Sequence, residues 1–155
     1  MTKEQLLKTA DELPKVSSEA LEEYASRRDQ MVSMINETML ARPDVKELVG
    51  ENNLDIMKDN HANHARFVES ILRKPDAQTL VETCLWVFRA YRSRGFHSSY
   101  WSAQLNTWVD VMKKNLNSSA AEAVYPLYNW FIIHIPDFTA LSDAQMDEME
   151  VSHEF

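Results

Sequence analysis

A chain of 155 residues, 45% of them hydrophobic, is long enough to bury one core and is expected to form a single domain spanning residues 1–155. A net charge of −8 argues against nucleic acid as the partner, because binding phosphates depends on Lys and Arg. The one cysteine, Cys84, excludes an internal disulfide framework, and no run approaches the roughly 18 apolar residues of a membrane span. The charged start MTKEQLLKTADELPK lacks the apolar stretch of a secretory signal, which predicts a cytoplasmic protein.

Helices are predicted along the whole chain, because it contains only two glycines and its apolar residues recur every three or four positions. The expected helical segments are 2–14, 17–41, 43–50, 52–74, 76–95, 98–116 and 119–135. Their expected N-caps are Thr2, Ser17 or Ser18, Asn52 or Asn53, Asp76, and Ser98 or Ser99. Ser119 and Glu122 have the spacing of a capping box, and a last short turn is expected after Ser142, in the acidic tail 136–155.

Two histidines stand on an otherwise apolar face of segment 52–74. This face runs through Met57, His61, His64, Val68 and Ile71. Burying an imidazole without a hydrogen-bond partner is unfavourable, so either neighbouring side chains bond these rings or the face borders a pocket. Both interpretations stay open at this point.

Three arginines gather where segment 76–95 ends. Arg89, Arg92 and Arg94 are spaced so that their guanidinium groups can converge on a carboxylate, although a solvated helix end has the same pattern. The four tryptophans can line a cavity near them or simply pack in the core.

Catalytic and metal sites are not predicted. A zinc site at His61 and His64 would need two further ligands, and no carboxylate is placed to supply them. Cys84 lies on an apolar stripe, where a thiol behaves as a small hydrophobic group. No acid and base pair accompanies a shaped substrate site, so we expect no enzyme.

Two stretches carry a family resemblance. Residues 92–105, RSRGFHSSYWSAQL, resemble the phycobiliprotein branch of the globin superfamily and the related bilin biosynthesis-associated globins of bacteria. His61-Ala62-Asn63-His64 occupies the place of the Cys-x-Arg-Asp pattern of phycobiliproteins, and Phe67 falls on a following aromatic position. The resemblance implies an all-α, globin-like fold of about seven to eight helices, with its core over residues 17–135. It also implies that the leading helix, within residues 1–16, serves pairing into a homodimer.

The same resemblance suggests the ligand. His61 replaces the cysteine that attaches the pigment, so a linear bilin would be bound noncovalently, and Ala90 at the place of the proximal histidine makes conventional haem ligation less expected. The hypothesis is a bilin-binding globin for carriage, storage or sensing, in which His61 and His64 contact the pyrroles. Arg89, Arg92 or Arg94 would bind the propionates, and Phe67, Trp86, Tyr91 and Trp101 would surround the rings. The alternatives are a haem-free signalling globin that acts by dimerisation, with or without a fatty acid, and a haem globin with unusual histidine ligation.

Overall fold

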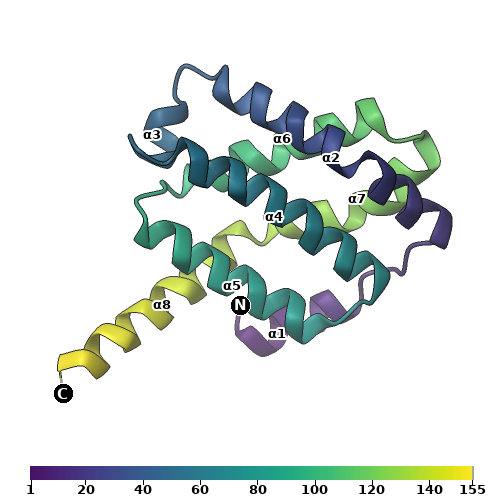
Figure 1. The fold of residues 1–155 in the computed structure, drawn as a ribbon. Coiled ribbons are helices and arrows are strands. Elements are labelled where there is room, and N and C mark those ends of the chain that lie inside the picture. Colours follow the sequence, from purple (N-terminus) through teal and green to yellow (C-terminus); the bar gives the residue numbers. More distant parts are fainter. Residues whose placement is uncertain (155) are drawn as a thin grey trace.

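The fold was analysed in a computed structural model, which describes residues 1–154, with side chains as far as Glu148. Within these residues the chain is all-α, as predicted, and no strand occurs. The helices, drawn in Figure 1, are α1 Lys3–Asp11, α2 Ser18–Leu40, α3 Val45–Val49, α4 Leu54–Arg73, α5 Ala77–Ser93, α6 Ser99–Asn115, α7 Ser118–Ile133 and α8 Ile135–Glu154.

Side-chain caps begin several of these helices where the sequence predicts them. Thr2 accepts a hydrogen bond from the backbone N–H of Gln5, whose side chain bonds back to complete a capping box. Ser17 caps α2 through the N–H of Ala20, and Asp76 caps α5 through that of Thr79. These starts are set by local sequence, which explains why the pattern identifies them.

Four helices differ from the prediction. The expected caps of α4 and α6, Asn53 and Ser98, make no side-chain hydrogen bond to the start of their helix. The cap of α7 is Asn117, whose side chain accepts from the N–H of Ala120, so α7 begins before the expected capping box at Ser119 and Glu122. The expected turn after Ser142 lies inside α8, where the Ser142 hydroxyl donates to the carbonyl of Thr139. The tail is thus helical through residue 154, and Phe155 lies outside the described residues.

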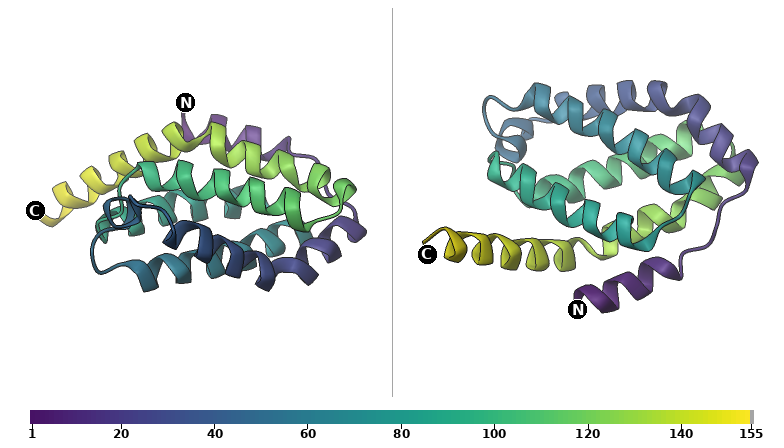
Figure 2. Two further views of the ribbon diagram at one scale, coloured as in Figure 1. Left: turned by 90° about the horizontal axis from the view of Figure 1, so that it is seen from above. Right: turned by 60° about the horizontal axis from the view of Figure 1, so that its bottom comes forward.

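The helices pack in two groups around one apolar core. α2 packs against α4, α6 and α7, and α6 packs against α7, whereas α5 packs against α1 and α8 (Figure 1). Figure 2 shows that α8 leaves the body of the molecule, with its far end away from the other helices. The largest fully buried side chains include Tyr24, Tyr100, Trp108, Tyr128 and Phe138. No helix in the described part of the chain is both long and apolar enough to cross a membrane.

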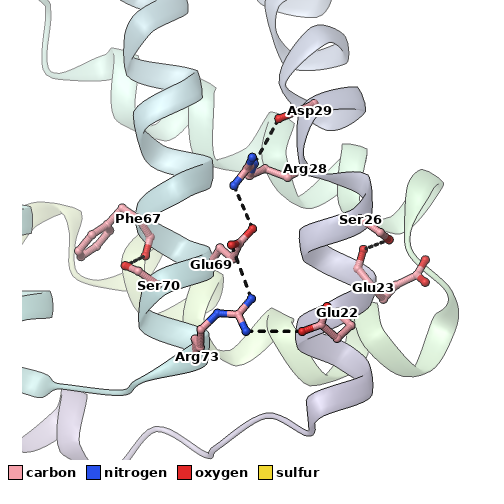
Figure 3. Close-up of polar contacts among 9 residues, drawn as sticks. All are labelled: Glu22, Glu23, Ser26, Arg28, Asp29, Phe67, Glu69, Ser70 and Arg73. Carbon is pink, nitrogen blue, oxygen red and sulfur yellow. Dashed lines mark hydrogen bonds and ion pairs between the residues drawn. The ribbon is translucent and has the colours of Figure 1, made fainter.

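An ion-pair network fixes α4 against α2 (Figure 3). Glu69 of α4, whose side chain is only 21% exposed, receives Arg28 of α2 at 3.1 Å and Arg73 of its own helix at 3.7 Å. Arg73 also reaches Glu22 of α2 at 3.6 Å. Because the network joins the two helices on their outer side, it orients the opposite face of α4 toward the remaining helices.

Both glycines lie in turns that one asparagine joins. Gly50, after α3, and Gly95, after α5, have positive φ angles of 93° and 100°, which glycine adopts without steric cost. The Asn53 side chain donates to the carbonyl oxygens of Val49 at 2.7 Å and Arg94 at 2.8 Å. The start of α4 is thereby tied to the end of α5, and the two helices are held at one end.

Candidate functional site

A cavity of about 240 Å³ lies between α4 and α5 and is called the α4–α5 cavity below. Side chains of α6, α7 and α8 complete it. Its lining consists of Asn60, Asn63, His64, Phe67, Thr83, Cys84, Trp86, Val87, Phe88, Tyr91, Trp101, Gln104, Leu105, Phe131 and Phe138. Five of the residues predicted as a binding site are therefore brought together here: His64, Phe67, Trp86, Tyr91 and Trp101.

Aromatic rings form most of the wall. Phe88 of α5 stacks on Trp101 of α6 with ring centroids 4.6 Å apart and an angle of 17° between the planes. Phe138 of α8 meets Phe88 edge-on at 5.3 Å, and Tyr91 meets Trp101 edge-on at 5.7 Å. Trp86, by contrast, is 56% exposed and contributes to the lining from a partly open position. The site thus offers flat apolar surfaces, which suit a flat ligand.

His64 supplies a polar group to this lining. Its Nε2 lies 2.8 Å from the hydroxyl of Tyr128, and its ring packs 4.9 Å from that of Trp108. Burial, with a smaller contribution from the nearby His61, lowers the pKa of His64 to about 3. The imidazole is therefore neutral near pH 7, with one ring nitrogen as a donor and the other as an acceptor.

His61 does not share this position. It is fully buried, its Nδ1 lies 2.7 Å from the Asn36 side-chain oxygen on α2, and its ring stacks near Tyr100 at 6.4 Å. Burial lowers its pKa to about 3 as well. The structure therefore does not bring His61 to the α4–α5 cavity, although the sequence grouped it with His64 as a ligand contact.

Two of the other polar side chains in the lining are buried. Asn60 and Gln104 are 4% and 1% exposed, and the Asn60 side-chain oxygen accepts from the Tyr100 hydroxyl at 2.7 Å and from Gln104 Nε2 at 3.2 Å. Gln104 Oε1 is buried without a hydrogen-bond partner among the described residues. Sequence reasoning missed both, yet the signal was present, because each is a polar residue within an apolar helical face, the pattern that singled out the histidines.

The arginines are placed elsewhere. Arg89 donates to the side chain of Gln145, and Arg92 donates to Asp143, so both bind α8 and not the α4–α5 cavity. Arg94 is exposed at the end of α5. Among the residues whose side chains are described, the expected convergence of all three on one carboxylate does not occur.

Arg92 instead lines a neighbouring cavity of about 350 Å³, called the Arg92 cavity below. Phe88 and Trp101 belong to the linings of both cavities. The stacked pair of rings is therefore a wall that the two cavities share.

Cys84 also lies in the cavity lining. Burial raises the pKa of its thiol well above the ordinary value, so the group stays protonated near pH 7 and is a poor nucleophile. Among the described residues, no three His, Cys, Asp or Glu side chains are grouped as a metal ion would require.

Comparisons with protein-family models, with curated proteins and with solved structures give no match to this chain.

Proposed function

We propose that this chain binds a linear tetrapyrrole noncovalently in the α4–α5 cavity, for carriage, storage or sensing, and that it catalyses no reaction on it. The observation that carries the proposal is the composition of the cavity. Stacked and edge-on aromatic rings surround it, and its few polar groups include a neutral His64 and a Gln104 oxygen that has no partner among the described residues. Apolar enclosure with a small number of polar anchors is typical of sites for flat organic ligands.

The size of the cavity favours a linear pigment over a closed macrocycle. At about 240 Å³ it is smaller than the roughly 300–1,000 Å³ of most small-molecule sites. A linear tetrapyrrole can place one end inside and extend past Trp86, whereas haem would have to enter with its full width. The lining residues in the described part of the chain include no Lys, Arg, Asp or Glu, so propionate groups belong outside the cavity.

Noncovalent binding follows from the state of the only thiol in the lining. The protonated Cys84 does not readily attack a vinyl or ethylidene group, and His61 is bonded to Asn36 away from the cavity. Pigment should therefore be released when the protein is denatured, and Cys84→Ala should retain binding.

The test is a titration of the purified protein with biliverdin, followed by visible absorption. Binding should sharpen and shift the pigment band, and Thr83→Trp, which fills the cavity from α5, should weaken binding at least about tenfold, as expected when the site is occupied by protein atoms. Thr79→Trp is the matched control, since Thr79 is exposed one turn earlier on the same helix and does not line the cavity. Absence of a shift, or equal effects of the two variants, would contradict the proposal.

The volume also favours a second candidate, a haem-free signalling domain whose cavity holds a fatty acyl chain. An extended chain fits a narrow apolar space, and its carboxylate would stay at the mouth because the lining has no cation. Native mass spectrometry that finds bound lipid in colourless protein would favour this candidate. A Soret band after adding haem would instead support histidine ligation of haem by His64. Homodimer formation stays a prediction in each case.

A further inference from the structure

A chain of three hydrogen-bonding groups runs from the core to the α4–α5 cavity. The hydroxyls of Tyr24 and Tyr128 are 2.8 Å apart, and the Tyr128 hydroxyl is 2.8 Å from His64 Nε2. Tyr24 and Tyr128 are both fully buried, and burial raises the pKa of each phenol, so both stay protonated. Tyr128 is the one hydrogen-bond partner of the Tyr24 hydroxyl within the described residues.

The number of available protons determines which group donates in each of these hydrogen bonds. The Tyr24 hydroxyl is buried and has one partner, so its proton is satisfied only if it donates to Tyr128. Tyr128 must then direct its own proton to His64 Nε2, which accepts it as an unprotonated nitrogen. Because the ring is neutral, the proton of His64 is on Nδ1. Nδ1 has no hydrogen-bond partner among the described residues, and His64 lines the cavity, so its N–H is a free donor there.

The cavity lining also includes a residue with a hydrogen-bond acceptor, Gln104. Gln104 is 1% exposed and donates through Nε2 to Asn60, while its Oε1 is buried without a partner in the described structure. Gln104 lines the cavity, and a buried carbonyl oxygen left without a donor destabilises a protein, so a ligand that donates to this oxygen would remove that cost.

We propose that the α4–α5 cavity recognises the edge of a lactam, a cyclic amide whose N–H and C=O lie side by side. The ligand carbonyl accepts from His64 Nδ1, and the ligand N–H donates to Gln104 Oε1, while the ligand rings pack against the wall that Phe88, Trp101 and Phe138 form. The assignment deepens the proposed function and rests on it, since both end rings of biliverdin are lactams. The same two hydrogen bonds could also be formed by a smaller flat lactam.

Three probes of similar shape test the recognition without a tetrapyrrole. 2-Quinolone is a flat lactam with both groups, N-methyl-2-quinolone lacks the N–H, and naphthalene lacks both. A cavity of about 150 Å³ accepts benzene, so about 240 Å³ is adequate for two fused rings. Binding to the full chain is measured by ligand-observed NMR. We expect 2-quinolone to bind about five- to a hundredfold more tightly than its N-methyl form, the effect of leaving one buried polar group unpaired.

Gln104→Met then isolates the acceptor. It keeps the length of the side chain but removes the oxygen, so the two quinolones should bind within about twofold of each other. Gln78→Met makes the same replacement at an exposed position of α5 and should keep the full preference. Because the preference is first measured in the unmodified protein, the test does not depend on the variant folding.

The donor is checked in the free protein by a long-range ¹H–¹⁵N correlation spectrum, which identifies the protonated ring nitrogen of each histidine. His64 should carry its proton on Nδ1. Tyr24→Phe removes the group that orients Tyr128, so both tautomers of His64 should then appear, whereas the exposed Tyr125→Phe should leave the signal unchanged.

A proton on Nε2 in the unmodified protein, equal affinity for the two quinolones, or tightest binding of naphthalene would overturn the lactam assignment. None of these results excludes biliverdin, whose titration tests the proposed function separately. Conversely, selective binding of 2-quinolone without any biliverdin shift would keep the lactam site and reject the tetrapyrrole.

Discussion

His61 and His64 lie one helical turn apart on α4, yet their side chains contact different helices. Residues three apart on a helix differ by roughly 60° around its axis, so neighbours on one apolar face can still point to different helices. His61 bonds Asn36 of α2, and His64 bonds Tyr128 of α7. The sequence predicts that both are inward, but the neighbour that each one meets depends on tertiary packing.

The two histidines make stability depend on pH. In the folded protein the pKa of each is lowered to about 3, whereas in the unfolded chain it returns to about 6.5. Below that value the unfolded state binds more protons, so their contribution is fully present above about pH 6.5 and is lost progressively as the pH falls toward 3. The free energy of unfolding should fall between pH 6.5 and 5.5 by about 1 kcal/mol for each histidine.

Urea unfolding at pH 7.5, 6.5 and 5.5 measures this slope. His64→Gln should remove about half of it, because only His61 then contributes the effect. His97→Gln, at an exposed histidine, is the control and should keep the slope of the unmodified chain. Identical slopes for all three proteins would mean that His64 takes up its proton in the folded state.

At the scale of elements, the starts of α1, α2 and α5 were predictable and helix partners were not. Thr2, Ser17 and Asp76 cap through bonds to residues three positions ahead, which a local pattern contains. α8 was expected only as a short turn after Ser142, yet it begins at Ile135 and Phe138 anchors it in the core with 0% exposure. That anchor packs against Phe88, 50 positions earlier in the chain, as well as against Trp130 of α7.

The contributions of Phe138 and of the surface ion pair of α8 to the free energy of unfolding can be compared directly. Phe138→Ala should lower the free energy of unfolding by about 3–5 kcal/mol, since it removes a buried ring and leaves a cavity. Asp143→Ala breaks the ion pair with Arg92, whose side chains are 39% and 54% exposed, and should cost less than about 1 kcal/mol. Chemical denaturation of both variants is the measurement, and similar costs would show that α8 is not held by its apolar first half.

At the scale of the whole molecule too, the sequence predicts what depends on local patterns but not what depends on contacts between distant residues. The apolar faces predicted the all-α class and placed His64, Tyr91 and Trp101 inward, whereas Phe67 was assigned through the family resemblance. The structure collects all four at one cavity. The arginines were assigned to the ligand from their mutual spacing alone. Their actual partners, on α8, lie more than 50 positions away and cannot be read from a local pattern.

Closure of the fold at one end depends on Asn53. Its amide satisfies two carbonyl oxygens in different turns, so Asn53→Ala should lower the free energy of unfolding by about 1–3 kcal/mol. Asn106→Ala, whose amide bonds only within α6, should have a smaller effect. Thermal unfolding of the two variants measures the difference, and equal losses would argue against a role of Asn53 in joining α3 to α5.

The course of α8 has a mechanical consequence. Phe138 in its first half is part of the cavity wall, while its second half extends away from the body of the molecule (Figure 2). A helix rises about 1.5 Å per residue, so a rotation of roughly 10° at Phe138 would carry the end of α8 sideways by roughly 4 Å. A small rearrangement of the cavity wall at Phe138 would thereby become a larger displacement of the α8 backbone at its far end.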